Sequence, residues 1–190
     1  MINCIEKLKS MAKVAPHYDN HHMVVDDNLA IEREFGEMLM DAVKESKAKT
    51  IVEVGTGTGY STSWILIGAI GNKGQVYTFD KEARPPFRWD QAGIPTDNLK
   101  VFNIDFSSVN GELPKKIDFV FHDSQHFFEL IKADLDILIP RISDGGQIWI
   151  HDVRDELNDR LSEFFNGIGW SYKNHSVACG ISQAVKPGRE

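Results

Sequence analysis

Five short apolar runs, separated by stretches with helical periodicity, constrain the fold of this chain more than any other feature. The runs lie at 51–54, 76–79, 99–102, 117–121 and 147–150. Such runs are typical of strands buried on both faces of a parallel sheet, because the helices that connect parallel strands cover both faces. Two further segments, 170–172 and 177–185, have no helix between them and indicate an antiparallel hairpin. The sequence predicts an α/β fold, a doubly wound and mostly parallel sheet with an antiparallel edge strand.

Three helices are well marked in the sequence. The segment 27–43 repeats apolar residues every three or four positions, and the stripe over 128–138 stops before Pro140. A third helix, over 155–168, begins with two acidic residues, which the helix dipole favours at that end. The pattern predicts a turn at 144–146 and, because of its proline pair, only a short or broken helix after 84–86.

Length and composition favour one soluble domain over residues 1–190, in which a helical segment (1–48) precedes a core (49–190). The net charge of −7 argues against a nucleic-acid partner, which would require a basic surface. The longest run of apolar residues and glycines has eight residues, whereas a membrane-spanning helix needs about 20. With two distant cysteines and no secretory signal, we expect a cytoplasmic protein that acts on a small molecule, with no membrane partner.

Three glycines at alternate positions, Gly55, Gly57 and Gly59, follow the first apolar run. Without a Cβ atom, they let the backbone approach a ligand closely before a helix begins near Tyr60 or Ser61, whose amides can meet an anionic group. The GxGxG pattern does not match the GxGxxG fingerprint of dinucleotide-binding proteins. It predicts a ligand site of a different kind.

Carboxylates follow the strands beside this loop. Asp80 lies 25 residues beyond Gly55, after the second run, where it can accept both hydroxyls of a ribose. Glu53 ends a buried strand, so a cationic ligand or an ordered donor should lie near it. Together with the glycine loop, these positions indicate a ligand with an adenosine and an amino-acid end.

These residues, with Asp123 and the segment 145–146, resemble the class I S-adenosylmethionine-dependent methyltransferases over about residues 50–152. The subgroup most similar is the small-molecule O-methyltransferases of the catechol and macrocin type. The resemblance implies a Rossmann-like sheet of seven strands whose last strand is antiparallel. It also implies that S-adenosylmethionine is bound by Glu53, Gly55, Thr56, Gly57, Gly59, Tyr60, Ser61, Asp80, Asp105, Phe106 and Asp123.

A second group of polar residues follows the fourth and fifth runs. In the subgroup that the chain resembles, Asp123, His151 and Asp152 would hold a divalent metal, and His126 would be the general base; the catalytic residues would be His126, Asp123 and His151. Here His151 replaces a carboxylate and His126 a lysine. Either the metal is softer than magnesium, or His151 is a second base and no metal binds. A further alternative is that Asp152 only caps the next helix.

The leading hypothesis is methyl transfer from S-adenosylmethionine to an oxygen of a small acceptor. Two alternatives stay open: a non-catalytic S-adenosylmethionine-binding module, and a nucleotide-dependent enzyme of another class on the same fold. The resemblance also implies that the segment 1–48 covers the substrate mouth. The acceptor is not predicted, and homodimer formation is left open.

Overall fold

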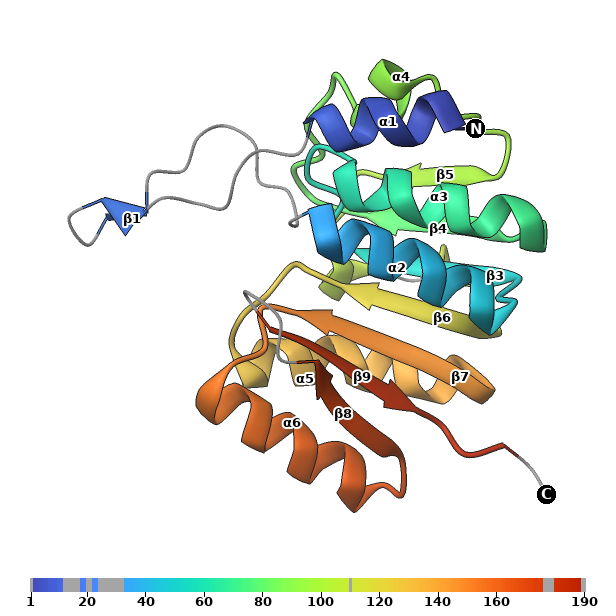
Figure 1. Cartoon of the computed structure of the whole chain (residues 1–190). Coiled ribbons are helices and arrows are strands. Elements are labelled where there is room, and N and C mark those ends of the chain that lie inside the picture. Colours follow the sequence, from blue (N-terminus) through green and yellow to red (C-terminus); the bar gives the residue numbers. More distant parts are fainter. Residues whose placement is uncertain are drawn as a thin grey trace.

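The computed structural model describes residues 2–11, 18–19, 22–23, 33–109, 111–175 and 180–188. Seven strands form one sheet in the order β5-β4-β3-β6-β7-β9-β8 (Figure 1). The chain order of these strands is β3 (Thr50–Val54), β4 (Gln75–Phe79), β5 (Leu99–Phe102), β6 (Ile117–His122), β7 (Ile142–His151), β8 (Ser171–His175) and β9 (Ile181–Val185). The pairs from β5 to β7 are parallel, and β9 is antiparallel to both of its neighbours. The predicted α/β sheet with an antiparallel edge region is confirmed.

Helices cover both faces of the sheet. One face carries α1 (Ile2–Met11), α2 (Arg33–Ser46), α3 (Tyr60–Asn72) and the short α4 (Arg88–Ala92). The other face carries α5 (Phe128–Leu138) and α6 (Asp155–Gly167), together with the 3-10 turn η1 (Phe106–Ser108). A second 3-10 turn, η2 (Ile139–Arg141), follows α5, and a two-stranded pair, β1 (Tyr18–Asp19) and β2 (His22–Met23), lies apart from the main sheet (Figure 1).

Three details differ from the sequence-based expectations or lie outside the described residues. The predicted turn at 144–146 is an irregularity inside β7, because the backbone there bonds to Lys186 and the pairing with β6 shifts register. The reversed strand β9 is the second strand from the edge, with β8 outside it. Part of the expected helix over 27–43, and most of the loop before it, lies outside the described residues.

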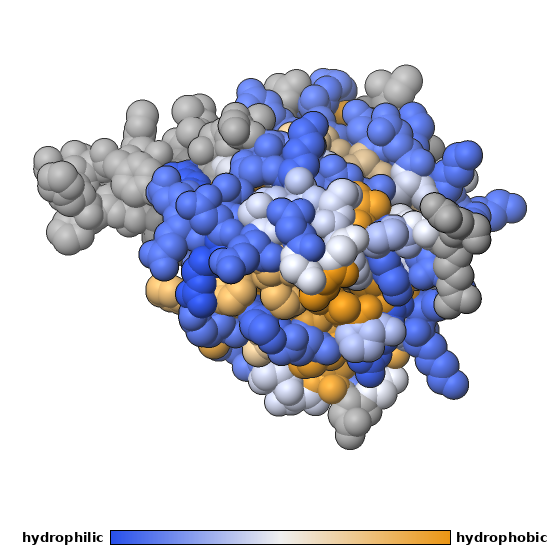
Figure 2. Space-filling view, turned by 90° about the horizontal axis from the view of Figure 1, so that it is seen from below, coloured by the Kyte–Doolittle hydropathy of each residue, from blue (hydrophilic) through white to orange (hydrophobic). Residues whose placement is uncertain are grey.

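Most large apolar side chains are buried in two clusters, one under each helical layer. Trp64 and Trp149, which the sequence predicts to be core residues, are 0% and 4% exposed. Figure 2 shows one face of the molecule, on which the hydrophobic residues that remain at the surface gather in one area bordered by hydrophilic ones. Within the described segments, every helix is too short or too polar to cross a membrane.

Candidate active site

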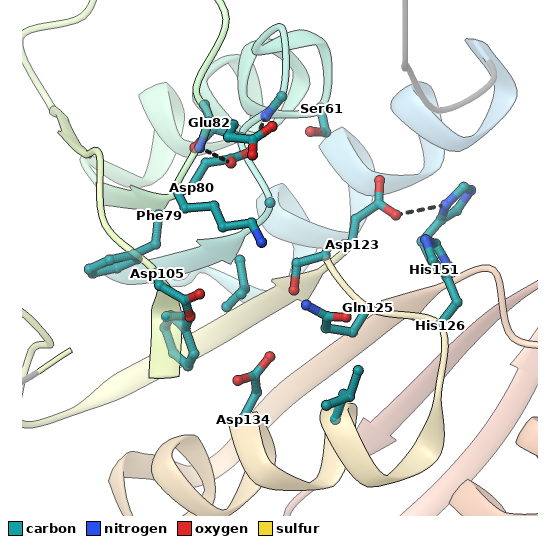
Figure 3. Close-up of a pocket in the computed structure, with 18 of the residues that line it drawn as sticks. Ser61, Phe79, Asp80, Glu82, Asp105, Asp123, Gln125, His126, Asp134 and His151 are labelled. Atoms are coloured by element: carbon teal, nitrogen blue, oxygen red, sulfur yellow. Dashed lines mark hydrogen bonds and ion pairs between the residues drawn. The ribbon is translucent and has the colours of Figure 1, made fainter. Parts of the chain in front are cut away.

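A cavity of about 530 Å³ opens at the carboxyl ends of the central strands (Figure 3). Every residue that the sequence predicts for the site lines this cavity, except Glu53 and Gly59. The sheet order explains this convergence, because β4, β3, β6 and β7 are adjacent and β3, β6 and β7 end at the same edge. The strand order reverses between β3 and β6, where ligands of open α/β sheets bind.

The glycine loop forms one wall of the cavity. Gly55, Gly57 and Gly59 have φ angles of 103°, 51° and 78°, in the region that side chains disfavour. At Gly55 a Cβ atom would lie only 2.3 Å from the backbone oxygen of Asp123, so the ends of β3 and β6 can approach only with glycine there. At Gly59 a Cβ atom would meet the ring of Trp89, which shows that this glycine serves packing behind the wall.

Asp80 connects the glycine loop to the segment after β4. Its Oδ2 accepts a hydrogen bond from the Gly57 backbone N–H at 2.7 Å, and its Oδ1 accepts one from the Glu82 N–H at 2.7 Å. The two bonds fix the carboxylate at the cavity wall. Because each carboxylate oxygen has two lone pairs, both can still accept bonds from ligand hydroxyls.

Asp105 and Phe106 line the cavity beyond Asp80. Asp105 is exposed, and its Oδ1 accepts bonds from the Ser107 hydroxyl and backbone N–H. These two bonds lower the pKa of the Asp105 carboxyl below its usual value. Phe106 is buried edge-on against Phe79, with 5.5 Å between ring centres, and this aromatic pair gives that end of the cavity an apolar wall.

Glu53 lies behind the glycine loop and is fully buried. Three hydroxyl groups donate hydrogen bonds to its carboxylate, from Ser61 at 2.6 Å, from Thr62 at 2.5 Å and from Thr78 at 2.6 Å. The expected partner of this carboxylate is therefore an ordered set of donors within the protein. Burial nevertheless raises the pKa of Glu53 to about 7, against the lowering effect of the hydroxyls, and the nearby Asp123 carboxylate adds to the increase.

We expect the raised pKa of Glu53 to make stability fall as pH rises. The folded protein holds this proton up to about pH 7, whereas the unfolded chain releases it near 4.5. The stabilising contribution of the protonated group is complete below pH 4.5 and decreases through pH 7. Relative to the variant Glu53→Gln, the wild-type free energy of unfolding should fall by about 3 kcal/mol between pH 4.5 and about pH 8. Urea unfolding of both proteins at several pH values measures this change. A difference in the free energy of unfolding between wild type and variant that does not depend on pH would contradict the prediction.

Two histidines and two aspartates meet on the opposite wall. His151 is buried at the end of β7, and its Nδ1 lies 3.1 Å from Oδ1 of Asp123, the interaction drawn in Figure 3. His126 is half exposed, and its Nδ1 lies 3.4 Å from Oδ2 of Asp152. Asp152 has a φ of 56° and precedes the N-cap residue of α6, Arg154, so the interpretation of Asp152 as a helix cap is wrong. Its carboxylate faces the histidines.

Asp123, His151 and Asp152 have the chemistry of a metal site. One ligand atom from each lies within 4.8 Å of the other two. One imidazole nitrogen and two carboxylate oxygens suit manganese, iron, nickel or zinc better than magnesium, which prefers oxygen ligands. Phe35 of α2 packs edge-on against the His151 ring, with 5.0 Å between centres, and limits the orientations of this imidazole.

The sequence did not predict several residues that line the cavity. The segment after Asp80 contributes Lys81, Glu82 and Arg84, and its position follows from a backbone bond between Arg84 N–H and the Gly57 oxygen. The remaining unpredicted lining residues come from the ends of β3, β4 and β6, from η1 and from α5: Val54, Phe79, Ser107, Ser124, Gln125, Leu130, Ala133 and Asp134. Asp134 is a charged residue at a position of α5 where the helical period predicts an apolar one. This departure from the pattern is a signal that could have identified it.

Comparison with known proteins agrees with this geometry. A family model described as a methyltransferase domain matches residues 52–153, more than half of the chain. No curated protein matches significantly. The fold is similar to cofactor-bound Rv0187 from MTB (TM-score 0.68, 18% identity, 99% of this chain and 90% of that one). It is also similar to an O-methyltransferase from Bacillus cereus in complex with SAH (TM-score 0.64, 20% identity, 83% of each chain).

A third similar structure is TomG from Streptomyces achromogenes, an O-methyltransferase of tomaymycin synthesis in complex with SAM (TM-score 0.60, 18% identity, 84% of this chain and 82% of that one). At these identities the likeness establishes the shared fold. The family model extends from within β3 to just past the end of β7, which is the region that forms the cavity. The resemblance drawn from the sequence is confirmed, and the chain belongs to the methyltransferase-domain family.

Proposed function

We propose that this protein transfers the methyl group of S-adenosylmethionine to a hydroxyl oxygen of a small molecule. One observation carries the proposal: a single cavity joins the glycine loop and Asp80 to the His126 and His151 cluster. A cofactor and an acceptor could therefore meet in it. Membership of the methyltransferase family supports the reaction type, and the SAM and SAH complexes of structurally similar O-methyltransferases support the cofactor.

The chain offers a complementary group for each part of the cofactor. The first amides of α3, near Tyr60 and Ser61, suit the carboxylate of the methionine part. Asp80 suits the ribose hydroxyls, because it is fixed by backbone donors and retains acceptor capacity. Phe106 offers an apolar surface to the flat base. Bound in this direction, the sulfonium group would lie near Asp123, whose negative charge favours a cation.

His126 is the residue best placed to receive the proton of the acceptor hydroxyl. The acceptor oxygen attacks the methyl carbon, the carbon–sulfur bond breaks with its electron pair left on sulfur, and S-adenosylhomocysteine is released. With a proton on Nδ1 directed at Asp152, the imidazole presents Nε2 as the base. The Asp152 carboxylate then stabilises the imidazolium that forms.

Asp123, His151 and Asp152 are the residues that would hold a divalent ion. When bound, such an ion would supply a positive charge that lowers the pKa of the acceptor hydroxyl. His151 would then act as a ligand, and the proton would still pass to His126.

A methyl-transfer assay tests the proposal. Purified protein is incubated with S-adenosylmethionine and matched pairs of small molecules, catechols or phenols against the corresponding anilines, and S-adenosylhomocysteine is measured. We expect turnover with hydroxyl acceptors, a lower rate after chelation, and recovery with manganese or zinc. Transfer only to the amines would contradict O-methylation. A full rate in protein shown to be metal-free by elemental analysis would contradict a role for a metal ion. The mechanism would then depend on His126 as the base, oriented by Asp152.

A further inference from the structure

A buried acid–base pair lies beneath the cavity, where β6 meets α5. His122 is the last residue of β6 and is 0% exposed, and Asp134 on α5 is 7% exposed. The imidazole Nε2 lies 2.9 Å from Oδ2 of Asp134. Asp134 lines the cavity, whereas His122 does not. The pair is outside the His126 and His151 cluster and has no part in the methyl transfer described above.

Asp134 has the properties of a ligand-facing group. In the described part of the chain, His122 is the only polar partner of its carboxylate, and it contacts Oδ2 alone. Oδ1 is left accessible from the cavity, where a donor group of a ligand can bond to it. Figure 3 shows this carboxylate rising from α5 into the space below Asp105 and Gln125. The contact between His122 Nε2 and Asp134 Oδ2 holds the side chain in this position, and it involves only one of the two carboxylate oxygens.

The surroundings of Asp134 match a flat heteroaromatic ring. Phe106 and Leu130 also line the cavity and offer apolar contact to ring faces. Asp105, the other carboxylate there, already accepts two bonds from Ser107 and is exposed. Both bonds of Asp105 fall on Oδ1, so Asp105 differs from Asp134 in its exposure to water, whereas Asp134 is buried and its carboxylate oxygens can accept a hydrogen bond from a ligand. The complementary ligand group is an N–H on the edge of a ring.

We propose that Asp134, positioned by His122, accepts a hydrogen bond from the 6-amino group of the cofactor's adenine and so determines specificity for the base. The inference rests on the proposed function, because it needs an adenosine ligand in this cavity. It adds a residue of α5 to the cofactor-binding residues that the sequence analysis predicts. A hydrogen bond to a charged group is worth enough to change affinity about 10- to 100-fold.

The test removes each partner of the proposed bond in turn. Calorimetry compares S-adenosylhomocysteine with its analogue in which hydrogen replaces the 6-amino group, on wild type and on Asp134→Ala. For wild type we expect the analogue to bind about 10- to 100-fold more weakly. For Asp134→Ala the two compounds should bind within about threefold of each other, since the acceptor is gone. Asp136→Ala is the matched control, because Asp136 is an exposed residue of the same helix whose partner among the described residues is Lys132.

The outcomes separate this inference from the proposed function. If wild type binds both compounds equally, Asp134 does not recognise the amino group and the inference is overturned, whatever the folding of the variant. If Asp134→Ala, folded by circular dichroism, keeps the wild-type preference, the inference is also overturned. If neither compound binds wild type, the proposed function fails together with the inference. A preference that is lost in Asp134→Ala and kept in Asp136→Ala supports it.

Discussion

Gly55→Ala should unfold more easily and lose cofactor binding. The new Cβ atom would lie 2.3 Å from the Asp123 oxygen and 2.7 Å from its carbonyl carbon, both of them backbone atoms that cannot rotate away. The φ of 103° adds strain for any side chain. Together these effects should lower the free energy of unfolding by about 3 to 5 kcal/mol. Because β3 and β6 must separate, we expect the affinity for S-adenosylhomocysteine to fall by about 100-fold or more.

Gly93→Ala is the matched control for this variant. Gly93 also has a positive φ, of 72°, but a Cβ atom there meets nothing within 4 Å. Only the conformational strain applies, about 1 to 2 kcal/mol, and cofactor affinity should not change. Urea unfolding and calorimetry measure both quantities. Equal losses of stability in the two variants would contradict a steric role for Gly55.

His126→Ala should abolish most of the catalytic rate and leave cofactor binding unchanged. His126 is half exposed at the cavity wall, and Asp152, its ion-pair partner in the described part of the chain, can orient it as a base. Removing a general base typically lowers kcat by about 10²- to 10⁴-fold. The ion pair of His126 is with Asp152, and the predicted cofactor-binding residues of the glycine loop and Asp80 stay in place in this variant. Steady-state kinetics with a hydroxyl acceptor and calorimetry with S-adenosylhomocysteine measure the two effects.

His175→Ala separates this effect from a general response to losing a histidine. His175 stacks on Trp149 at the far edge of the sheet, with 5.1 Å between ring centres, and does not line the cavity. Its variant should turn over at the wild-type rate. A rate for His126→Ala within about threefold of wild type would contradict the assignment of His126 as the base.

Local sequence signals predicted the parts of the molecule that local rules govern. The helix that starts at Tyr60 follows from three glycines after an apolar run, and α6 begins with its two acidic residues, Asp155 and Glu156. Convergence of Asp80, Asp123 and His151 on one edge follows from parallel strand order alone. The cavity residues at strand ends were therefore predictable without coordinates.

Features that depend on register and on packing between distant segments were not predictable in this way. The partners of Glu53 include Thr78, which is brought there by the pairing of β3 with β4. The pairing of His122 with Asp134 requires α5 to pack on β6, and Asp134 lies among apolar stripe positions. The length of β7 depends on β9, whose continuation at Lys186 bonds to the irregular segment at Gly145 and Gly146.

Titration calorimetry of the wild-type protein with S-adenosylhomocysteine tests the central claim most directly. The cavity between the glycine loop, Asp80 and Asp123 should bind one molecule per chain with measurable heat, and NAD should give none, because the loop lacks the dinucleotide fingerprint. Folded protein that gives no heat with S-adenosylhomocysteine, or that binds NAD in its place, would contradict the account.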